Sequence, residues 1–165
     1  SGDLPPYLSL YDTWSRYEPE SEGVLVAYAS IHGGTAAAAQ KFADMLRARG
    51  AEKVVVSDLS RSDMAEVIED AFRYPRMVLA ASSYDGGVFP VMHDFLHHLQ
   101  IKNFQKRRIG IIENGSWAPC AARAMRSILD QMKDITLAEP IVTLRSRMKQ
   151  TDIPAMEALA EVLLG

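Results

Sequence analysis

Residues 24–35, Val24-Leu25-Val26-Ala27-Tyr28-Ala29-Ser30-Ile31-His32-Gly33-Gly34-Thr35, run from an unbroken apolar segment into a polar turn with two glycines. An apolar segment without alternation is typical of a β-strand that helices cover on both faces. The alanine-rich segment 35–49 follows and places Phe42 and Leu46 on one face of a predicted helix, which Gly50 ends. This stretch therefore predicts a strand, a turn and a helix.

Segment 23–40 contains no Asp, Glu, Lys or Arg, and its length approaches the roughly 20 residues that a membrane-spanning helix needs. The polar turn with its two glycines excludes that interpretation. The N-terminus shows no basic region followed by an apolar one, so no signal peptide is expected. We expect a cytoplasmic protein without a membrane partner.

The composition narrows the functional classes further. The chain has 165 residues, 48% of them hydrophobic, and 18 Lys and Arg against 21 Asp and Glu give a net charge of -3. Such a length favours one domain, and charges spread along the chain argue against a nucleic-acid partner. The single cysteine, Cys120, excludes an intrachain disulfide and a multi-thiolate metal site.

Strands and helices alternate along the rest of the chain. Further apolar runs lie at 53–56, 77–81, 109–112 and 141–144, of which the last is more polar and is predicted at an edge of the sheet. Predicted helices span 60–72 with Ser60 as the N-cap, 90–99, 118–132 and 151–164. Alternation of this kind predicts an α/β fold, a doubly wound parallel sheet in a three-layer sandwich over 23–165. Residues 1–22 form an N-terminal linker in which Tyr7, Leu10, Tyr11 and Trp14 are spaced as on an amphipathic helix.

Three loops that follow strands have an unusual composition, whereas the loops after the second and fifth strands do not. They are Ser30 to Thr35, Ser82 to Gly87, and Glu113 to Pro119. Ligands of open α/β sheets bind at this edge. The first loop opens onto a helix N-terminus but has no lysine and no G-x-G-x-x-G, so it fits a monophosphate. The alternative is an ordinary turn with Thr35 as the N-cap.

The other two loops each contribute an aromatic residue, Tyr84 or Trp117, beside glycines. All three loops together would suit a planar aromatic cofactor that carries one terminal phosphate. In the alternative interpretation, the two aromatic side chains plug the edge of the sheet and Asp85-Gly86-Gly87 is only a turn.

The first loop resembles the phosphate loop of flavodoxins, usually Ser/Thr-x-x-Gly-x-Thr, at Ser30, Gly33 and Thr35. Residues 28–36, 81–90 and 112–119 are more specifically similar to the flavodoxin-like domain of flavodiiron proteins, and the resemblance runs from about 24 to 164. It implies a flavodoxin-like, five-stranded parallel sheet in the order 2-1-3-4-5. The sequence departs from the family pattern at Gly34, Ser83, Asp85 and Cys120.

The resemblance implies FMN as the cofactor, with no catalytic residue and no metal ligand in this chain. The phosphate would be held by Ser30, Ile31, His32, Gly33, Gly34 and Thr35. The isoalloxazine ring would lie between Ser83, Tyr84, Asp85, Gly86 and Gly87 on one side and Asn114, Gly115, Ser116 and Trp117 on the other. A fixed carboxylate at Asp85 or Glu113 could lower the flavin potential, although a turn role for Asp85 is the favoured interpretation.

In the whole family protein, FMN passes electrons to a non-haem diiron site. The ligand pattern H-x-E-x-D-H of that site is missing from this chain. The resemblance therefore implies as partners a diiron domain of the parent protein, on the same or a neighbouring subunit, and a donor such as rubredoxin or a reductase. The alternative is a free-standing NAD(P)H-dependent FMN or quinone reductase of the same fold.

Three further features have ordinary explanations. His93, His97 and His98 are read as a solvated or partly packed helix face, and Cys120 as a buried, inert thiol. Lys102, Lys106, Arg107 and Arg108 are read as a solvated face that could dock an acidic redox partner.

Overall fold

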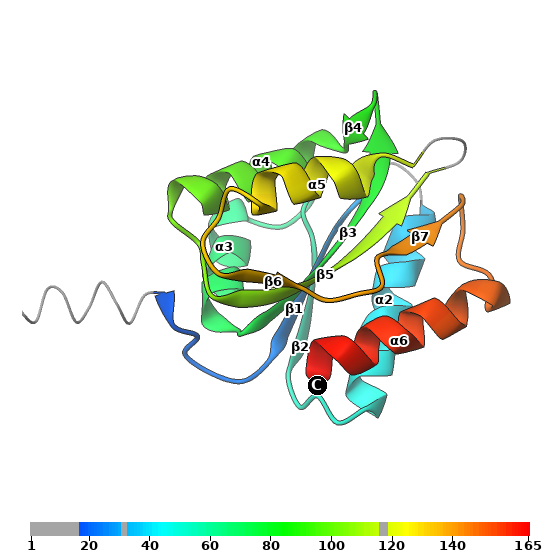
Figure 1. The fold of residues 1–165 in the computed structure, drawn as a ribbon, viewed down its shortest axis with the longest axis horizontal. Coiled ribbons are helices and arrows are strands. Elements are labelled where there is room, and N and C mark those ends of the chain that lie inside the picture. The colour runs from blue at the N-terminus through cyan, green and yellow to red at the C-terminus, as the bar shows by residue number, and fades with distance from the viewer. Residues whose placement is uncertain (1–16, 31–32, 116–118) are drawn as a thin grey trace, which may run out of the picture.

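A computed structural model describes residues 17–30, 33–115 and 119–165, and shows a sheet between two layers of helices (Figure 1). Helices α2 (Gly33–Ala48) and α6 (Ile153–Leu164) cover one face, and α3 (Met64–Arg73), α4 (Pro90–Ile101) and α5 (Ala121–Leu129) cover the other. The strands are β1 (Val24–Ala29), β2 (Val54–Asp58), β3 (Arg76–Tyr84), β4 (Gly87–Val88), β5 (Arg107–Asn114), β6 (Ile135–Leu137) and β7 (Val142–Leu144). A 3-10 turn at Gln150–Asp152 precedes α6. The predicted three-layer α/β sandwich is confirmed.

The sheet has the order β2-β1-β3-β5-β6, and these strands pair in parallel. This is the predicted order 2-1-3-4-5 with two differences. Strand β4, which was not predicted, forms an antiparallel hairpin with β3. The fifth position is occupied by two short strands, because β6 pairs with Arg107–Ile109 of β5 and β7 pairs with Ile112–Asn114. Pro140 lies between β6 and β7 and has no N–H to donate to the ladder.

Alternate residues of the central strands face opposite layers. Leu25 and Ala27 of β1 pack toward α3, α4 and α5, whereas Val24 and Val26 pack toward α2 and α6. All four side chains are at most 1% exposed. Burial on both faces explains why the run in β1 is apolar without alternation.

Two predicted helix starts are wrong. Helix α3 begins at Met64 and is capped by Asp63, whose carboxylate accepts from Ala65 N over 3.2 Å. Ser60 lies instead in the turn after β2, where its N–H donates to the Asp58 carboxylate over 2.9 Å. Helix α5 is shorter than the predicted 118–132, because it starts after Cys120 and ends at Leu129.

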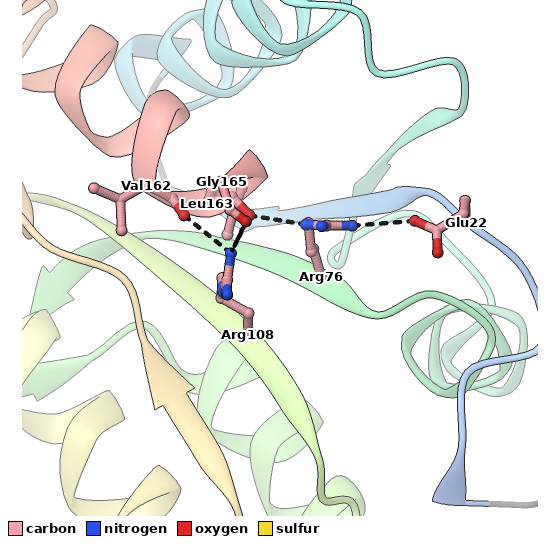
Figure 2. A network of polar contacts seen from close by, with 6 residues as sticks. All are labelled: Glu22, Arg76, Arg108, Val162, Leu163 and Gly165. Carbon is pink, nitrogen blue, oxygen red and sulfur yellow. Dashed lines mark hydrogen bonds and ion pairs between the residues drawn. The ribbon is translucent and has the colours of Figure 1, made fainter.

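Two arginines at the amino end of the sheet hold the C-terminal turn of α6 (Figure 2). Arg76 Nε donates to Leu163 O over 2.8 Å, and Arg108 donates to the carbonyls of Val162, Leu163 and Gly165 over 3.0–3.3 Å. Arg76 also pairs with Glu22 over 3.2 Å. Cations at a helix C-terminus are favourable because the last carbonyls lack partners within the helix.

The prediction of a solvated face over Lys102, Lys106, Arg107 and Arg108 is wrong at Arg107. This side chain is 2% exposed and donates to the carbonyls of Tyr17, Phe72, Gln105 and Lys106. Lys106 pairs with Glu18 over 2.9 Å. The end of the linker, 17–22, is therefore attached to the amino end of the sheet. The predicted aromatic helix at Tyr7 to Trp14 lies outside the described residues.

Candidate functional site

The β3–β4 hairpin is the first part of the site at the carboxyl end of the sheet. Asp85 and Gly86 have φ of 48° and 77° between the paired residues Tyr84 and Gly87. Two consecutive positive φ angles in a two-residue hairpin loop correspond to a type I′ turn, for which Asp-Gly is a preferred pair. Asp85 thus has the turn role favoured from the sequence. Tyr84 is 42% exposed and contacts Phe89 edge to face, with ring centroids 5.8 Å apart.

Ser83 connects this hairpin to the start of α5. Its hydroxyl oxygen accepts from Cys120 N over 2.8 Å and from Ala121 N over 3.2 Å. It therefore caps a helix that follows a different strand. The half-buried Cys120 thiol donates to Gly87 O over 3.1 Å. A Cβ on Gly115 would lie 3.0 Å from the Ser83 hydroxyl, so the two loops approach one another closely.

Thr35 lies inside the first turn of α2, because the helix begins at Gly33. The alternative in which Thr35 is the N-cap is therefore wrong. Its side chain is fully buried, and its hydroxyl shares a hydrogen bond of 3.1 Å with Ser82 Oγ and accepts one of 3.1 Å from Asn114 Nδ2. One buried hydroxyl thus joins the first turn of α2 to the ends of β3 and β5.

A fourth loop reaches this edge, which the sequence did not indicate. Asn114 Nδ2 donates to Ser146 O, and Ser146 N donates to Asn114 Oδ1, both over 2.9 Å. A Cβ on Gly34 would collide with Ser146 O. The loop after β7 therefore packs against the start of α2, and Gly34 is required there for lack of a side chain. The loop after the fifth strand has no unusual composition in the sequence, and only the contacts of Ser146 place it beside the other loops.

Glu113 is 8% exposed, and both of its carboxylate oxygens accept hydrogen bonds. The donors are Ala122 N over 3.0 Å and Thr143 Oγ1 over 2.7 Å. The carboxylate thus stabilises the first turn of α5, where negative charge is favourable. On β1, burial and then the charge of Asp58 raise the pKa of Tyr28, and the charge of Arg61 partly offsets this rise.

The structure brings most of the predicted binding residues to one edge of the sheet. Ser30 follows β1, and Gly33 and Gly34 open α2, whose first turn contains no acidic residue. Because the first N–H groups of a helix lack acceptors within it, this turn can bind an anion. Ile31, His32, Ser116 and Trp117 lie outside the described residues.

The histidines agree with the expected solvated face. His93, His97 and His98 are exposed on α4, and the rings of His93 and His97 are stacked with centroids 6.4 Å apart.

Within the described ranges, no three His, Cys, Asp or Glu side chains are grouped so that they could hold a metal ion. Nor does any helix in those ranges have the length and apolar character to span a membrane.

No protein-family model and no curated protein matches the chain.

Solved structures with this fold are nonetheless numerous. Rubredoxin oxygen:oxidoreductase from Desulfovibrio gigas superposes with a TM-score of 0.84 at 14% identity, over 94% of this chain and 38% of that one. The flavodiiron protein from Giardia intestinalis gives 0.76 at 16% identity, over 94% of this chain and 38% of that one. A flavodoxin from Streptococcus pneumoniae TIGR4 gives 0.73 at 21% identity, over 87% of this chain and 98% of that one. The fold is therefore flavodoxin-like, and the chain spans less than half of the length of the flavodiiron structures.

Proposed function

We propose that the chain binds FMN at the carboxyl end of its sheet and acts as an electron-transfer domain. The observation that carries this proposal is the joining of the first turn of α2, the Tyr84 hairpin and Asn114 by hydrogen bonds at one edge. The turn of α2 offers N–H groups without a competing carboxylate, which suits a phosphate. Tyr84 offers a half-exposed aromatic ring, which suits a flat ligand.

The described residues fit this cofactor in both chemistry and space. A Cβ on Gly33 or Gly86 would meet no atom within 4 Å, so each of these backbones is open to a ligand. Gly33, Gly34 and Ser30 would hold the phosphate, and Tyr84, Gly86 and Gly115 would flank the ring. When bound, the flavin supplies one- or two-electron transfer. Thr35, Ser83 and Asn114 would then act mainly by fixing the loops, since their polar groups are bonded to one another or to neighbouring loops.

The proposal extends to partners. Electrons would pass to a diiron domain of a longer parent protein, from a donor such as rubredoxin or a reductase, in a cytoplasmic setting. The likeness to two flavodiiron structures over 94% of this chain supports this extension. A free-standing NAD(P)H-dependent FMN or quinone reductase is the second candidate. The match to 98% of the length of a flavodoxin supports only its free-standing character.

A flavin titration tests the proposal. We expect saturable FMN binding with quenched flavin fluorescence and negligible steady-state oxidation of NAD(P)H by the loaded chain. Colourless protein without saturable binding would overturn the proposal, and rapid NAD(P)H turnover would favour the reductase.

A redox titration of Asp85→Asn tests the separate hypothesis that this carboxylate lowers the flavin potential. Equal potentials in the variant and the wild type would reject that hypothesis.

A further inference from the structure

The turn that follows β7 carries three cationic residues within a short span, Arg145, Arg147 and Lys149, and all three are exposed. Arg147 N donates to Arg145 O over 2.9 Å, and Ser146 between them has a φ of 72°. A hydrogen bond between residues two apart, around a residue with positive φ, is a strained γ-turn. This turn holds Arg145 and Arg147 on either side of Ser146.

The turn is fixed beside the start of α2. The amide of Asn114 binds both backbone groups of Ser146, and Ser146 O lies against the Cα of Gly34. The connection from β7 to α6 accordingly lies at the same edge as the start of α2 (Figure 1). Arg145 and Arg147 are therefore held close in space to the first turn of α2, where we propose that the phosphate binds.

The start of α2 offers no negative charge that would compete for Arg147. The first turn of α2 has no acidic residue. The carboxylate of Asp152 accepts from Lys149 N over 2.8 Å, and Lys149 Nζ donates to Arg145 O over 2.9 Å, so Lys149 is engaged within the loop. Across the described part of the chain, the Arg147 guanidinium has no hydrogen-bond or ion-pair partner. An arginine without a partner at this place is suited to a phosphate.

We propose that Arg145 and Arg147 bind the phosphate group of the flavin and set a preference for FMN over riboflavin. The inference rests on the flavin binding proposed above and adds two residues that neither the loop motifs nor the strand ends indicated. A phosphate monoester carries close to two negative charges at neutral pH. Two guanidinium groups beside it would strengthen binding by direct hydrogen bonds and by charge, and the charge effect would weaken with salt.

Titrations with FMN and with riboflavin test this inference. Exposed charge pairs contribute modestly to binding, so we expect Arg147→Gln to weaken FMN binding about threefold and the double variant Arg145→Gln/Arg147→Gln about tenfold. Riboflavin binding should change by less than about twofold, since riboflavin lacks the phosphate. Arg126→Gln, an exposed arginine in the last turn of α5, is the matched control and should leave both affinities unchanged.

The salt dependence gives a second readout that a merely structural role of the loop would not change. Raising NaCl from about 20 mM to about 500 mM should weaken FMN binding in the wild type more than in the double variant. Equal losses for FMN and riboflavin, or unchanged FMN affinity in the double variant, would overturn the inference and leave flavin binding intact. A wild type that binds neither flavin would instead overturn the proposed function, and this inference with it.

Discussion

Asn114 is the residue whose removal should loosen the candidate site most. It is 8% exposed, and its amide makes three hydrogen bonds, one to Thr35 Oγ1 over 3.1 Å and two to the backbone of Ser146 over 2.9 Å. A hydrogen bond contributes about 1 kcal/mol net. Asn114→Ala should therefore lower the free energy of unfolding by about 3 kcal/mol. In a chain of this size, that loss corresponds to a drop in Tm of about 6–12 °C.

Urea unfolding of the chain without flavin measures this loss. Gln100→Ala is the control, because among the described residues its exposed amide bonds only to Gln131, over 2.7 Å, and this bond should contribute less than about 0.5 kcal/mol. Asn114→Asp keeps the acceptor for Ser146 N but places an oxygen opposite Ser146 O, so it should be at least as destabilised as the alanine variant. If the free energy of unfolding of Asn114→Ala lies within about 1 kcal/mol of the wild-type value, the amide does not hold the loops together.

Three further changes probe other parts of the structure. Gly34→Ala should lower the free energy of unfolding by about 2 kcal/mol, because its Cβ would collide with Ser146 O. Gly33→Ala should not be destabilised, because its Cβ meets no atom within 4 Å. Urea unfolding of the two variants measures this difference. Burial and the charge of Asp58 raise the folded-state pKa of Tyr28. The contribution of this residue to stability is therefore complete below pH 10 and is lost as pH rises through the folded-state pKa. Tyr28→Phe should flatten this decline of the unfolding free energy with pH, and equal slopes in the variant and the wild type would contradict the expectation. Arg107→Met should cost about 3 kcal/mol, because four backbone carbonyls lose their donor, and should speed proteolysis near residue 17; unchanged stability would refute the role.

The layers could be predicted because they depend on local patterns, whereas the strand order was expected from the resemblance to flavodoxin-like domains. Strand β1 has the bounds expected from its apolar run, since a strand buried on both faces needs apolar residues at every position. The cap of α3 could not be predicted with the same certainty. Ser60 and Asp63 are both residues that cap helices, and only the turn formed by Asp58 excludes Ser60.

The sequence could predict that the candidate site lies at one edge of the sheet. It could not predict which residues face the cofactor and which hold the loops together. Thr35, Ser83 and Asn114 were expected to contact the cofactor, and their polar groups prove to be bonded to one another's loops. The contact between Asn114 and Ser146 joins residues far apart in the chain, so no spacing in the sequence reveals it. Arg107 was misread for the same reason, because its burial depends on carbonyls from three separate segments.

Amide chemical-shift mapping during an FMN titration tests the central claim most directly. We expect the shifts to concentrate at the first turn of α2, the Tyr84 hairpin, Gly115 and the turn around Ser146, while the amides near Arg76 and Arg108 at the opposite end of the sheet stay unchanged. Saturable shifts at the amino end of the sheet, or no shifts at the start of α2, would contradict it.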